Sequence, residues 1–475
     1  MPVVPEEMKT EKTVLVITND FPFCGIFPSA YKRMIGYYRY LPRYGWRVIV
    51  LSRICCCSIG REEAYQGIVL QGGSDWRESL EAYLIRNQEQ SRLFIGFRAG
   101  MTSLAARQMR LQVKSGAVQP SPDHSVFWCP RLRSAGSSRP QGSSCLLTAA
   151  RKSLSFLMLV GRPYLDWQKE GSEIGRALCR RAKVDVVLSS SPMLSNHILG
   201  REIQSKCRVP WVCEFRDSVR RNVQWWEPSP LWQWRYAFLR KNAAAVHVTR
   251  KEALADSWLR LRKSYIVENG FLEEETFRAL EKAQRSKDVF ILRYLGSMYA
   301  GKISLLMFLE GLGKLIAAQK IPSGKIRFEY YGNSAGLVRH EVASSRLQDY
   351  CRIHGMVGPD EALALAAASH VLVLPSTLLA DDVPGAKLYE YLALKRPILA
   401  TRRQGGYIEK LLDETGTGKV ASTPEAVSRI LGGWFHEFEE SGEIIMAFND
   451  AKIAGFSRAS GAERMAGILD QILRK

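Results

Sequence analysis

The chain of 475 residues carries a net charge of +20 at pH 7, and 46% of its residues are hydrophobic and 24% are charged. This length predicts two or three domains, and the composition is that of a folded globular protein rather than a disordered one. No sequence period of about 20–50 residues is present, which excludes a solenoid or a propeller. Residues 1–12 hold no apolar run, and no window reaches about 18 uninterrupted apolar residues, so we expect neither a secretory signal nor a membrane-spanning helix.

The positive charge lies almost entirely in the first half of the chain. Up to Gly270 there are 41 Lys and Arg against 22 Asp and Glu, whereas the remainder is nearly neutral. Asp123 is the only acid between Gln90 and Leu165, where eleven basic residues lie. Such a field attracts an anionic partner, which is a phosphorylated substrate, a lipid surface or a nucleic acid. The alternative is a basic surface that only maintains solubility, because surface charge alone specifies no partner.

The ten cysteines are scattered and include no CxxC pair. This pattern predicts free thiols in a reducing cytoplasm rather than disulfides or a zinc site. Cys55, Cys56 and Cys57 are adjacent, and we expect them to end a buried strand, because free cysteine packs as a small hydrophobe.

The first part of the chain alternates between β-branched strands and helices. Strands over residues 13–18 and 47–52, with a loop and a helix over 30–43 between them, form a β–α–β unit in which parallel pairing is expected. Further strands are predicted over residues 184–189, 210–215, 245–249 and 265–268. The alternation predicts a Rossmann-like domain over residues 1–270.

The same pattern restarts later, which predicts a second Rossmann-like domain over residues 271–458. Its strands are expected over residues 289–295, 325–331, 371–375, 397–400 and 419–421. The charge-dense stretch 273–288 is predicted to be the linker. A last helix, within residues 459–475, is expected to pack back on the first domain.

Residues 60–161 fit this alternation poorly, and we interpret them as a basic insertion with two helices and a flexible Ser/Gly/Pro loop over 134–144. Basic residues interleaved with Leu, Phe and Met are typical of a helix that lies on a membrane surface. A core helix with one solvated face explains the same pattern.

The most informative segment is residues 381–401, DDVPGAKLYEYLALKRPILAT. Asp382 and Glu390 have seven residues between them, and Pro384 followed by Gly385 predicts a helix start. The free N–H groups and positive dipole of a helix N-terminus make a site for a diphosphate. Glu390 could then accept hydrogen bonds from a ribose diol, and Asp382 could meet sugar hydroxyls. On spacing alone, a capped surface helix with ordinary acids is the favoured interpretation.

In its context, this segment resembles the retaining glycosyltransferases of GT-B fold in the glycogen-synthase-like group called family 4. Their hallmark is two acids with seven residues between them, Gly three residues after the first acid and Pro seven after the second. Asp382, Gly385, Glu390 and Pro397 stand at these positions. The resemblance continues in LGSMYAGK (residues 295–302), where Gly296 matches a strand-end glycine and Lys302 a phosphate-binding lysine.

The resemblance spans most of the chain except residues 60–161. SSSPMLSNHILG (189–200) and VPWVCEFRDSV (209–219) are similar to the branch that acts on lipid carriers in cell-envelope synthesis. Two departures stand out: Asp382 replaces the usual Glu, and Ser297 replaces the usual Arg.

The resemblance implies an α/β protein of two Rossmann-like domains facing across a cleft, and transfer with retention at the anomeric carbon. The donor-binding residues that it implies are Gly25, Gly296, Ser297, Lys302, Pro384, Gly385, Ala386, Lys387 and Glu390. The catalytic residues are predicted to be Asp217, Arg216, Lys302 and Asp382.

A nucleotide sugar departs as a nucleoside diphosphate, so negative charge develops on the leaving phosphate. Lys302, Lys387 and the N–H groups near Gly385 could stabilise this charge without a metal or any other cofactor. Asp217 is predicted to orient or deprotonate the acceptor hydroxyl, and Arg216 to bind an acceptor phosphate. A structural ion pair is the alternative for these last two residues.

These observations predict a cytoplasmic glycosyltransferase of hexosyltransferase type, peripheral at the inner face of the membrane. It would transfer sugar from a nucleotide-sugar donor to a lipid-linked or glycan acceptor in cell-surface polysaccharide synthesis. The basic first domain would face the anionic leaflet. The alternatives are a nucleotide-sugar epimerase on the same fold, an inactive glycan-binding relative and a basic nucleic-acid binder. We expect no nucleic-acid partner, because the acid pair has no role in that interpretation and no recognition signature is present.

Overall fold

The computed structural model describes residues 12–18, 28–53, 68–71, 76–98, 163–191, 194–216, 237–241, 244–249, 253–254, 256–261, 263–298, 303–377 and 384–474. The chain divides into two compact units. The first comprises Met1–Val267 together with Ala462–Lys475, and the second is Glu268–Gly461.

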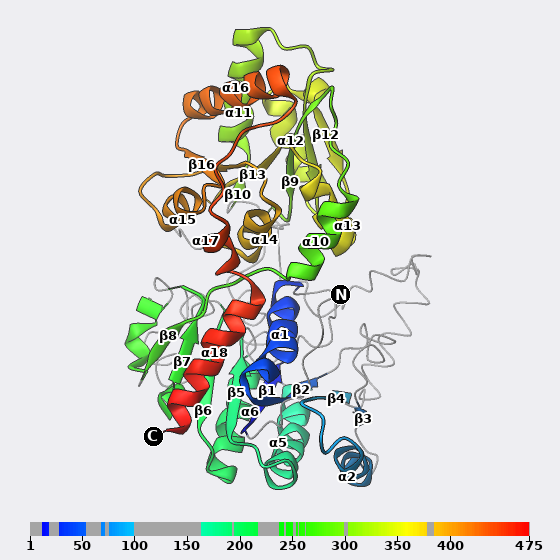
Figure 1. Ribbon diagram of the computed structural model, residues 1–475, viewed down its shortest axis with the longest axis vertical. Helices are drawn as coiled ribbons and strands as arrows, with labels where there is room; N and C mark the ends of the chain where they lie inside the picture. The colour runs from blue at the N-terminus through cyan, green and yellow to red at the C-terminus, as the bar shows by residue number, and fades with distance from the viewer. Residues whose placement is uncertain are drawn as a thin grey trace, which may run out of the picture. The chain divides into compact units, whose positions relative to one another are not determined.

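In the described part of the first unit, eight strands form one parallel sheet in the order β3-β4-β2-β1-β5-β6-β7-β8 (Figure 1). The central strands are continuous apolar runs, as expected for strands covered by helices on both faces. The strand bounds are β1 (Lys12–Thr18), β2 (Trp46–Arg53), β3 (Ile68–Gln71), β4 (Arg92–Arg98), β5 (Val186–Ser190), β6 (Trp211–Phe215), β7 (Ala244–His247) and β8 (Ser264–Ile266).

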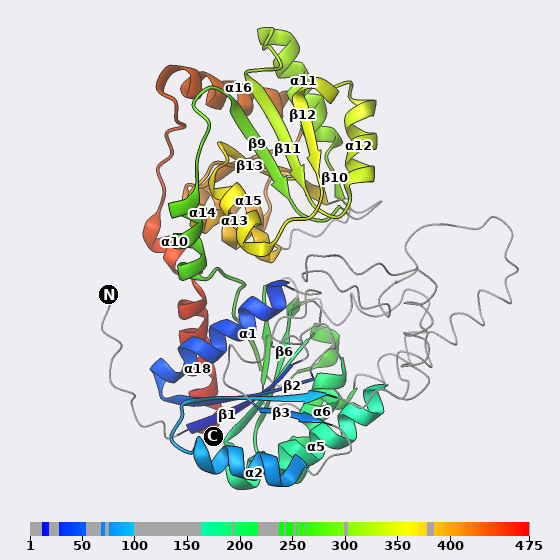
Figure 2. The ribbon, with the colours of Figure 1, turned by 90° about the vertical axis from the view of Figure 1, so that its right-hand side faces the viewer.

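Helices cover both faces of this sheet. One face buries an apolar cluster under α2 (Trp76–Arg86), α5 (Pro163–Arg181) and α6 (Leu194–Cys207), which lie together in Figure 2. The other described helices of this unit are α1 (Pro28–Tyr40) and, from Ala462 onwards, the last helix, α18 (Arg458–Leu473). Asp470 of α18 accepts hydrogen bonds from Lys12 Nζ at 2.6 Å and from Trp46 Nε1 at 3.0 Å. The short 3₁₀ helices are η1 (Leu41–Tyr44), η5 (Ala237–Lys241) and η6 (Ser257–Leu259).

The prediction of an insertion from residue 60 onwards is wrong for residues 68–98. These residues supply β3, α2 and β4, which extend the sheet from β2. The arginines that begin and end β4, RLFIGFR, hid its strand pattern, whereas α2 buries Leu80, Tyr83 and Leu84 at helical spacing. The remainder of the predicted insertion, residues 99–161, lies outside the described residues, as does the run Cys55–Cys57. Cys179, Cys207, Cys213 and Cys351 are free thiols.

In the second unit, six described strands form a parallel sheet in the order β12-β11-β9-β13-β15-β16. A separate antiparallel pair joins β10 to β14. The strand bounds are β9 (Phe290–Leu295), β10 (Ile303–Ser304), β11 (Ile326–Tyr331), β12 (Cys351–His354), β13 (Val371–Leu374), β14 (Ser376–Thr377), β15 (Ile398–Thr401) and β16 (Gly418–Ala421).

Two apolar clusters sandwich this second sheet. The first involves α11 (Leu306–Gln319), α12 (Ala335–Ser344) and α16 (Pro424–Ser441), and α11 lies beside α16 in Figure 1. The second involves α10 (Glu273–Lys282), α13 (Pro359–Ala367), α14 (Ala386–Leu394), α15 (Tyr407–Thr415) and α17 (Asp450–Ala454). A short 3₁₀ helix, η7 (Gln348–Tyr350), precedes β12. The two parallel sheets confirm the predicted α/β class with two Rossmann-like units.

The linker predicted over residues 273–288 is wrong in its first part, because Glu273–Lys282 forms helix α10. Three glutamates occupy its first turn, where they complement the helix dipole. Thr276 and Ala279 are buried, and Ala279 belongs to the apolar cluster of α13 and α14. The high charge density of this stretch is therefore the solvated face of an amphipathic helix.

Candidate active site

Each sheet reverses its strand order at the first strand of its unit. In the second unit, β11 and β12 lie on one side of β9, whereas β13, β15 and β16 lie on the other. This is the 3-2-1-4-5-6 order of dinucleotide-binding folds, in which ligands bind beyond the carboxyl ends of the strands at the point of reversal. In this unit that point is the end of β9, where Gly296 and Ser297 follow.

The turn after β9 is braced by side chains of β9, β11 and the start of α12. Tyr330 Oη donates to the carbonyl of Gly296 at 2.8 Å, and Tyr294 Oη donates to the carbonyl of Ser297 at 2.9 Å. Ser334 Oγ accepts from the N–H of Met298 at 3.1 Å and donates to its carbonyl at 2.8 Å. These bonds fix the backbone of the turn, so its geometry is set by the sheet.

Helix α14 begins with the predicted Pro-Gly pair. Pro384 is buried, and Gly385 is an exposed N-cap at φ −70° and ψ 162°. A glycine cap has no side-chain oxygen to accept from the first N–H groups, which suits binding of an anion at the helix start. Ala386 and the exposed Lys387 form the first turn, and Glu390 follows one turn later, half-buried.

Tyr391 connects α14 to β9. Its buried hydroxyl accepts from the N–H of Leu295, the last residue of β9, at 3.4 Å. Burial raises the pKa of Tyr391, so its hydroxyl stays protonated. This hydrogen bond links helix α14, which also carries Glu390, to the strand that leads to Gly296.

The β10–β14 pair lies next in sequence to two predicted residues. Ile303 pairs with Thr377, and Ser304 pairs with Ser376. Lys302 precedes Ile303 in the chain, and Asp382 follows Thr377 by five residues. Lys302 and Asp382 themselves lie outside the described residues.

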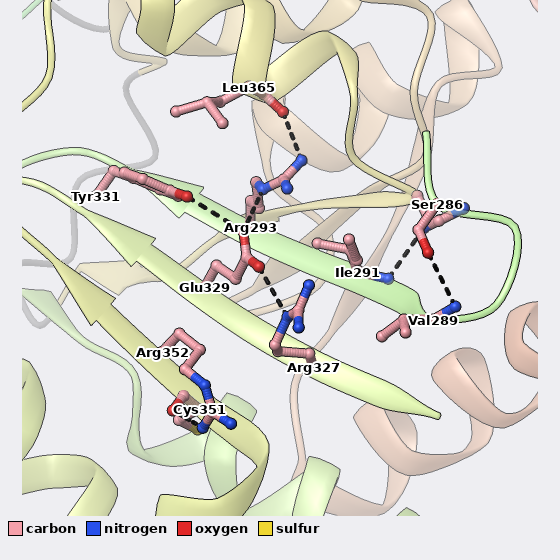
Figure 3. Close-up of polar contacts among 11 residues, drawn as sticks. Ser286, Val289, Ile291, Arg293, Arg327, Glu329, Tyr331, Cys351, Arg352 and Leu365 are labelled. Carbon is pink, nitrogen blue, oxygen red and sulfur yellow. Dashed lines mark hydrogen bonds and ion pairs between the residues drawn. The ribbon is translucent and has the colours of Figure 1, made fainter. Parts of the chain in front are cut away.

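A network of ion pairs fastens the middle of this sheet (Figure 3). Glu329 on β11 accepts a hydrogen bond from Arg293 Nε at 2.7 Å and forms an ion pair with Arg327 Nε at 2.8 Å. Arg293 also donates to the carbonyl of Leu365 on α13 at 2.9 Å. Burial alone would raise the pKa of Glu329, but the charges of the two arginines and the hydrogen bond from Arg293 lower it, so Glu329 is ionised. The network ties β9, β11 and α13 together beneath the turn at Gly296.

In the first unit, Arg216 stands directly after β6 and is half-buried. Its backbone N–H donates to Ser191 Oγ at 2.8 Å, and the N–H of Ser191 donates to the carbonyl of Glu214 at 2.9 Å. Since β5 and β6 are neighbours, this places Arg216 at the carboxyl edge of the first sheet, where ligands of such sheets bind. Asp217 and Gly25 lie outside the described residues.

The structure therefore joins Gly296, Ser297, Pro384, Gly385, Ala386, Lys387 and Glu390 on linked elements of the second unit. Sequence reasoning missed the residues that hold them, which are Tyr294, Tyr330, Ser334 and Tyr391. The sequence does show Tyr294 two residues before Gly296 and Tyr330 two residues before Gly332. Their role in bracing the turn depends on the pairing of the two strands, which the sequence alone does not show.

Other features of the described residues add no second site. No three His, Cys, Asp or Glu side chains among them converge as metal ligands. None of the helices in the described ranges is long and apolar enough to cross a membrane. A cavity of about 240 Å³ in the second unit is lined in part by Lys410, Glu414 and Lys452, and both lysines form ion pairs with Glu414.

The chain thus has two units, each with a parallel sheet that reverses at its first strand, and the second sheet has the strand order of dinucleotide-binding folds. Residues 289–431, which lie in the second unit, match the family model described as glycosyl transferases group 1.

Solved structures are similar over almost the whole chain. A glycosyltransferase from Rickettsia africae has a TM-score of 0.54 and 15% identity, covering 98% of this chain and 99% of its own. A sucrose-phosphate synthase from Thermosynechococcus elongatus has a TM-score of 0.52 and 12% identity, with coverage of 98% and 99%. The apo structure of OtsA has a TM-score of 0.55 and 12% identity, with coverage of 96% and 99%. No curated protein matches the chain.

At these identities the structural similarity shows the fold, which is the predicted GT-B fold. The family match supports glycosyltransferase function.

Proposed function

We propose that this protein is a retaining glycosyltransferase of hexosyltransferase type that uses a nucleotide-sugar donor and a lipid-linked or glycan acceptor. It works without a metal, in cell-surface polysaccharide synthesis, in the cytoplasm at the inner face of the membrane. The observation that carries the proposal is the start of α14: a glycine-capped helix, fastened through Tyr391 to the end of β9, inside the matched family segment.

The chemistry follows from where charge develops. The bond between the anomeric carbon and the diphosphate oxygen breaks, and negative charge grows on that oxygen. The N–H groups at the start of α14, together with Lys387 and Lys302, stabilise this charge. The acceptor oxygen forms the new bond on the face that the diphosphate leaves, Asp217 orients or deprotonates the acceptor hydroxyl, and Arg216 binds the acceptor phosphate.

A thermal-shift panel of UDP-, GDP- and ADP-sugars tests the donor site. A matching nucleotide sugar at about 100 times its Kd stabilises the folded protein by about 2.7 kcal/mol. Glu390→Gln, which keeps the side-chain size but removes the charge, weakens binding about tenfold, whereas the control Glu361→Gln on α13 leaves it unchanged. A protein that no nucleotide sugar stabilises would contradict the donor assignment. Deuterium incorporated from solvent into recovered nucleotide sugar would indicate an epimerase instead.

Liposome flotation tests the membrane proposal. Each Lys or Arg near an anionic surface contributes about 1 kcal/mol, and this attraction is screened by salt. We therefore expect binding that grows with anionic lipid content and falls with added salt. Binding that ignores both would refute this part. Transfer that persists in EDTA checks that no metal is required.

A further inference from the structure

A buried ion pair in the first unit has no part in the chemistry above. Glu214 on β6 and Arg33 on α1 are 0% and 1% exposed. Arg33 Nε donates to Glu214 Oε1 at 2.7 Å, and Tyr37 Oη donates to the same oxygen at 2.6 Å. Ser190 Oγ, at the end of β5, donates to Glu214 Oε2 at 2.6 Å. One carboxylate thus joins α1, β5 and β6.

Both partners stay charged inside this cluster. Burial alone would lower the pKa of Arg33, but the charge of Glu214 raises it above its ordinary value. Burial alone would raise the pKa of Glu214, but Arg33 and the hydrogen bonds of Ser190 and Tyr37 lower it. Stability does not require such an arrangement, because replacing a buried ion pair by well-packed apolar side chains is often neutral or stabilising. The position of the pair points to a different role.

The cluster lies at the carboxyl edge of the sheet and is continuous with Arg216. Ser190, which donates to Glu214, is followed by Ser191, whose Oγ accepts from the N–H of Arg216 at 2.8 Å. The carbonyl of Glu214 accepts from the N–H of Ser191 at 2.9 Å. Arg33 Nη2 also donates to the carbonyl of Val267, the last residue before the chain enters the second unit, at 2.8 Å. The carboxylate of Glu214 and the backbone of Arg216 are therefore connected through two hydrogen bonds and the peptide bond between Ser190 and Ser191.

We propose that the Arg33–Glu214 pair is a positioning device that holds the ends of β5 and β6 in register, so that Arg216 is presented at the sheet edge to a phosphate on the acceptor. This inference rests on the proposed role of Arg216 in acceptor binding. Ser191 is the relay, since its hydroxyl is the group that touches the backbone of Arg216. Neither Arg33 nor Glu214 contacts the acceptor.

Calorimetric titration of the full chain with geranyl phosphate, a soluble lipid phosphate, tests the proposal. Ser191→Ala removes the relay while leaving the ion pair intact. Arg33→Met combined with Glu214→Gln removes the charges, yet the introduced amide can still pair with Tyr37 and Ser190, which guards against unfolding. We expect both variants to weaken geranyl phosphate binding about tenfold or more, and neither to change the affinity for UDP, GDP or ADP.

Ser189→Ala is the matched control. Ser189 is buried, like Ser190 and Ser191, and lies in β5 directly before them. Its hydroxyl, however, contacts His197 Nδ1 at 2.8 Å and Trp211 Nε1 at 2.7 Å on the opposite face of the sheet. Ser189→Ala should lower the melting temperature and leave geranyl phosphate binding unchanged. The positioning role is overturned if Ser191→Ala or the double variant binds like the unmodified chain, or if Ser189→Ala weakens binding equally. If the unmodified chain does not bind, or Arg216→Ala binds as well as it does, the acceptor role of Arg216 fails and the inference falls with it.

Discussion

Gly332, directly after β11, is the residue whose substitution should disturb the candidate donor site most selectively. A methyl group built on its backbone would lie 2.1 Å from the carbonyl oxygen of Gly296 and 2.3 Å from Tyr330 Oη. Non-bonded heavy atoms are comfortable at about 3.5 Å or more, so Gly332→Ala must displace the Gly296 carbonyl or its own strand end by more than about 1 Å. The hydrogen bond from Tyr330 to Gly296 is lost with that movement.

The magnitude follows from two effects. Overpacking of a well-filled site destabilises a protein by about 1–3 kcal/mol. Misplacement of a binding group by about 1 Å can reduce catalysis by about 100-fold. We therefore expect Gly332→Ala to lower the affinity for nucleotide sugar at least tenfold, together with a stability loss of about 1–3 kcal/mol.

Calorimetric unfolding and nucleotide titration measure the two effects separately. The control is Gly336→Ala on the adjoining helix α12, where an added methyl group meets nothing within 4 Å. Gly336 lies in the first turn of α12, so this change should stabilise by at most the value of about 0.5–1 kcal/mol for a helix interior and should not alter nucleotide affinity. Gly332→Ala binding nucleotide as well as the unmodified chain would refute the assignment of the turn at Gly296 to the donor.

Three further substitutions probe other parts of the structure. Burial lowers the pKa of His370 to about 4, and its Nδ1 accepts from the N–H of Ile291 at 2.9 Å. As pH falls below about 6.5, His370 is protonated in the unfolded chain but stays neutral in the folded protein. The free energy of unfolding therefore falls by about 2 kcal/mol between pH 7 and pH 5. His370→Asn, which keeps an acceptor, should flatten the pH dependence of the melting temperature, and unchanged pH dependence would contradict this. Asp470→Ala removes the acceptor of Trp46 Nε1 and should destabilise the first unit by about 1–3 kcal/mol in thermal unfolding, with Asp470→Asn losing less. Gly385→Ala meets nothing within 4 Å and should reduce stability by about 1 kcal/mol or less, yet weaken nucleotide binding in titration; equal affinity would place the diphosphate elsewhere.

Much of the fold could be predicted from the sequence because most strands are buried on both faces. Runs such as VLVI in β1 and VLVL in β13 are apolar throughout, as parallel strands between helices require. The hydrophobic pattern failed to predict the strands and helices that carry charged residues. β4 begins and ends with arginine, and α10 carries three glutamates in its first turn, so both resembled irregular polar segments. Their identity as a strand and a helix depends on partners that are distant in sequence.

Part of the candidate donor site could be predicted from the sequence because some of its residues belong to one helix. Glu390 lies in α14 and Gly385 is the N-cap of the same helix, so their spacing in sequence fixes their spacing in space. Gly332 and Glu214 act on residues of other elements, and no local pattern shows that. Glu214 in particular is an acid within an apolar run, WVCEF, which reads as a strand but not as the partner of Arg33, 181 residues away.

The turn at Gly296 shows how strand register specifies a binding surface. Tyr294 and Tyr330 are directly opposite each other in the β9–β11 pairing, with ring centroids 5.9 Å apart. From these positions both hydroxyls reach the two carbonyls that follow β9. A slip of one residue would turn the Tyr330 ring to the other face of the sheet, where it could not reach that turn. The same registration brings Gly332 against Gly296, so only a residue without a side chain fits there. The geometry of the turn is therefore a consequence of sheet formation, and variants that shift register should lose nucleotide binding before they lose the fold.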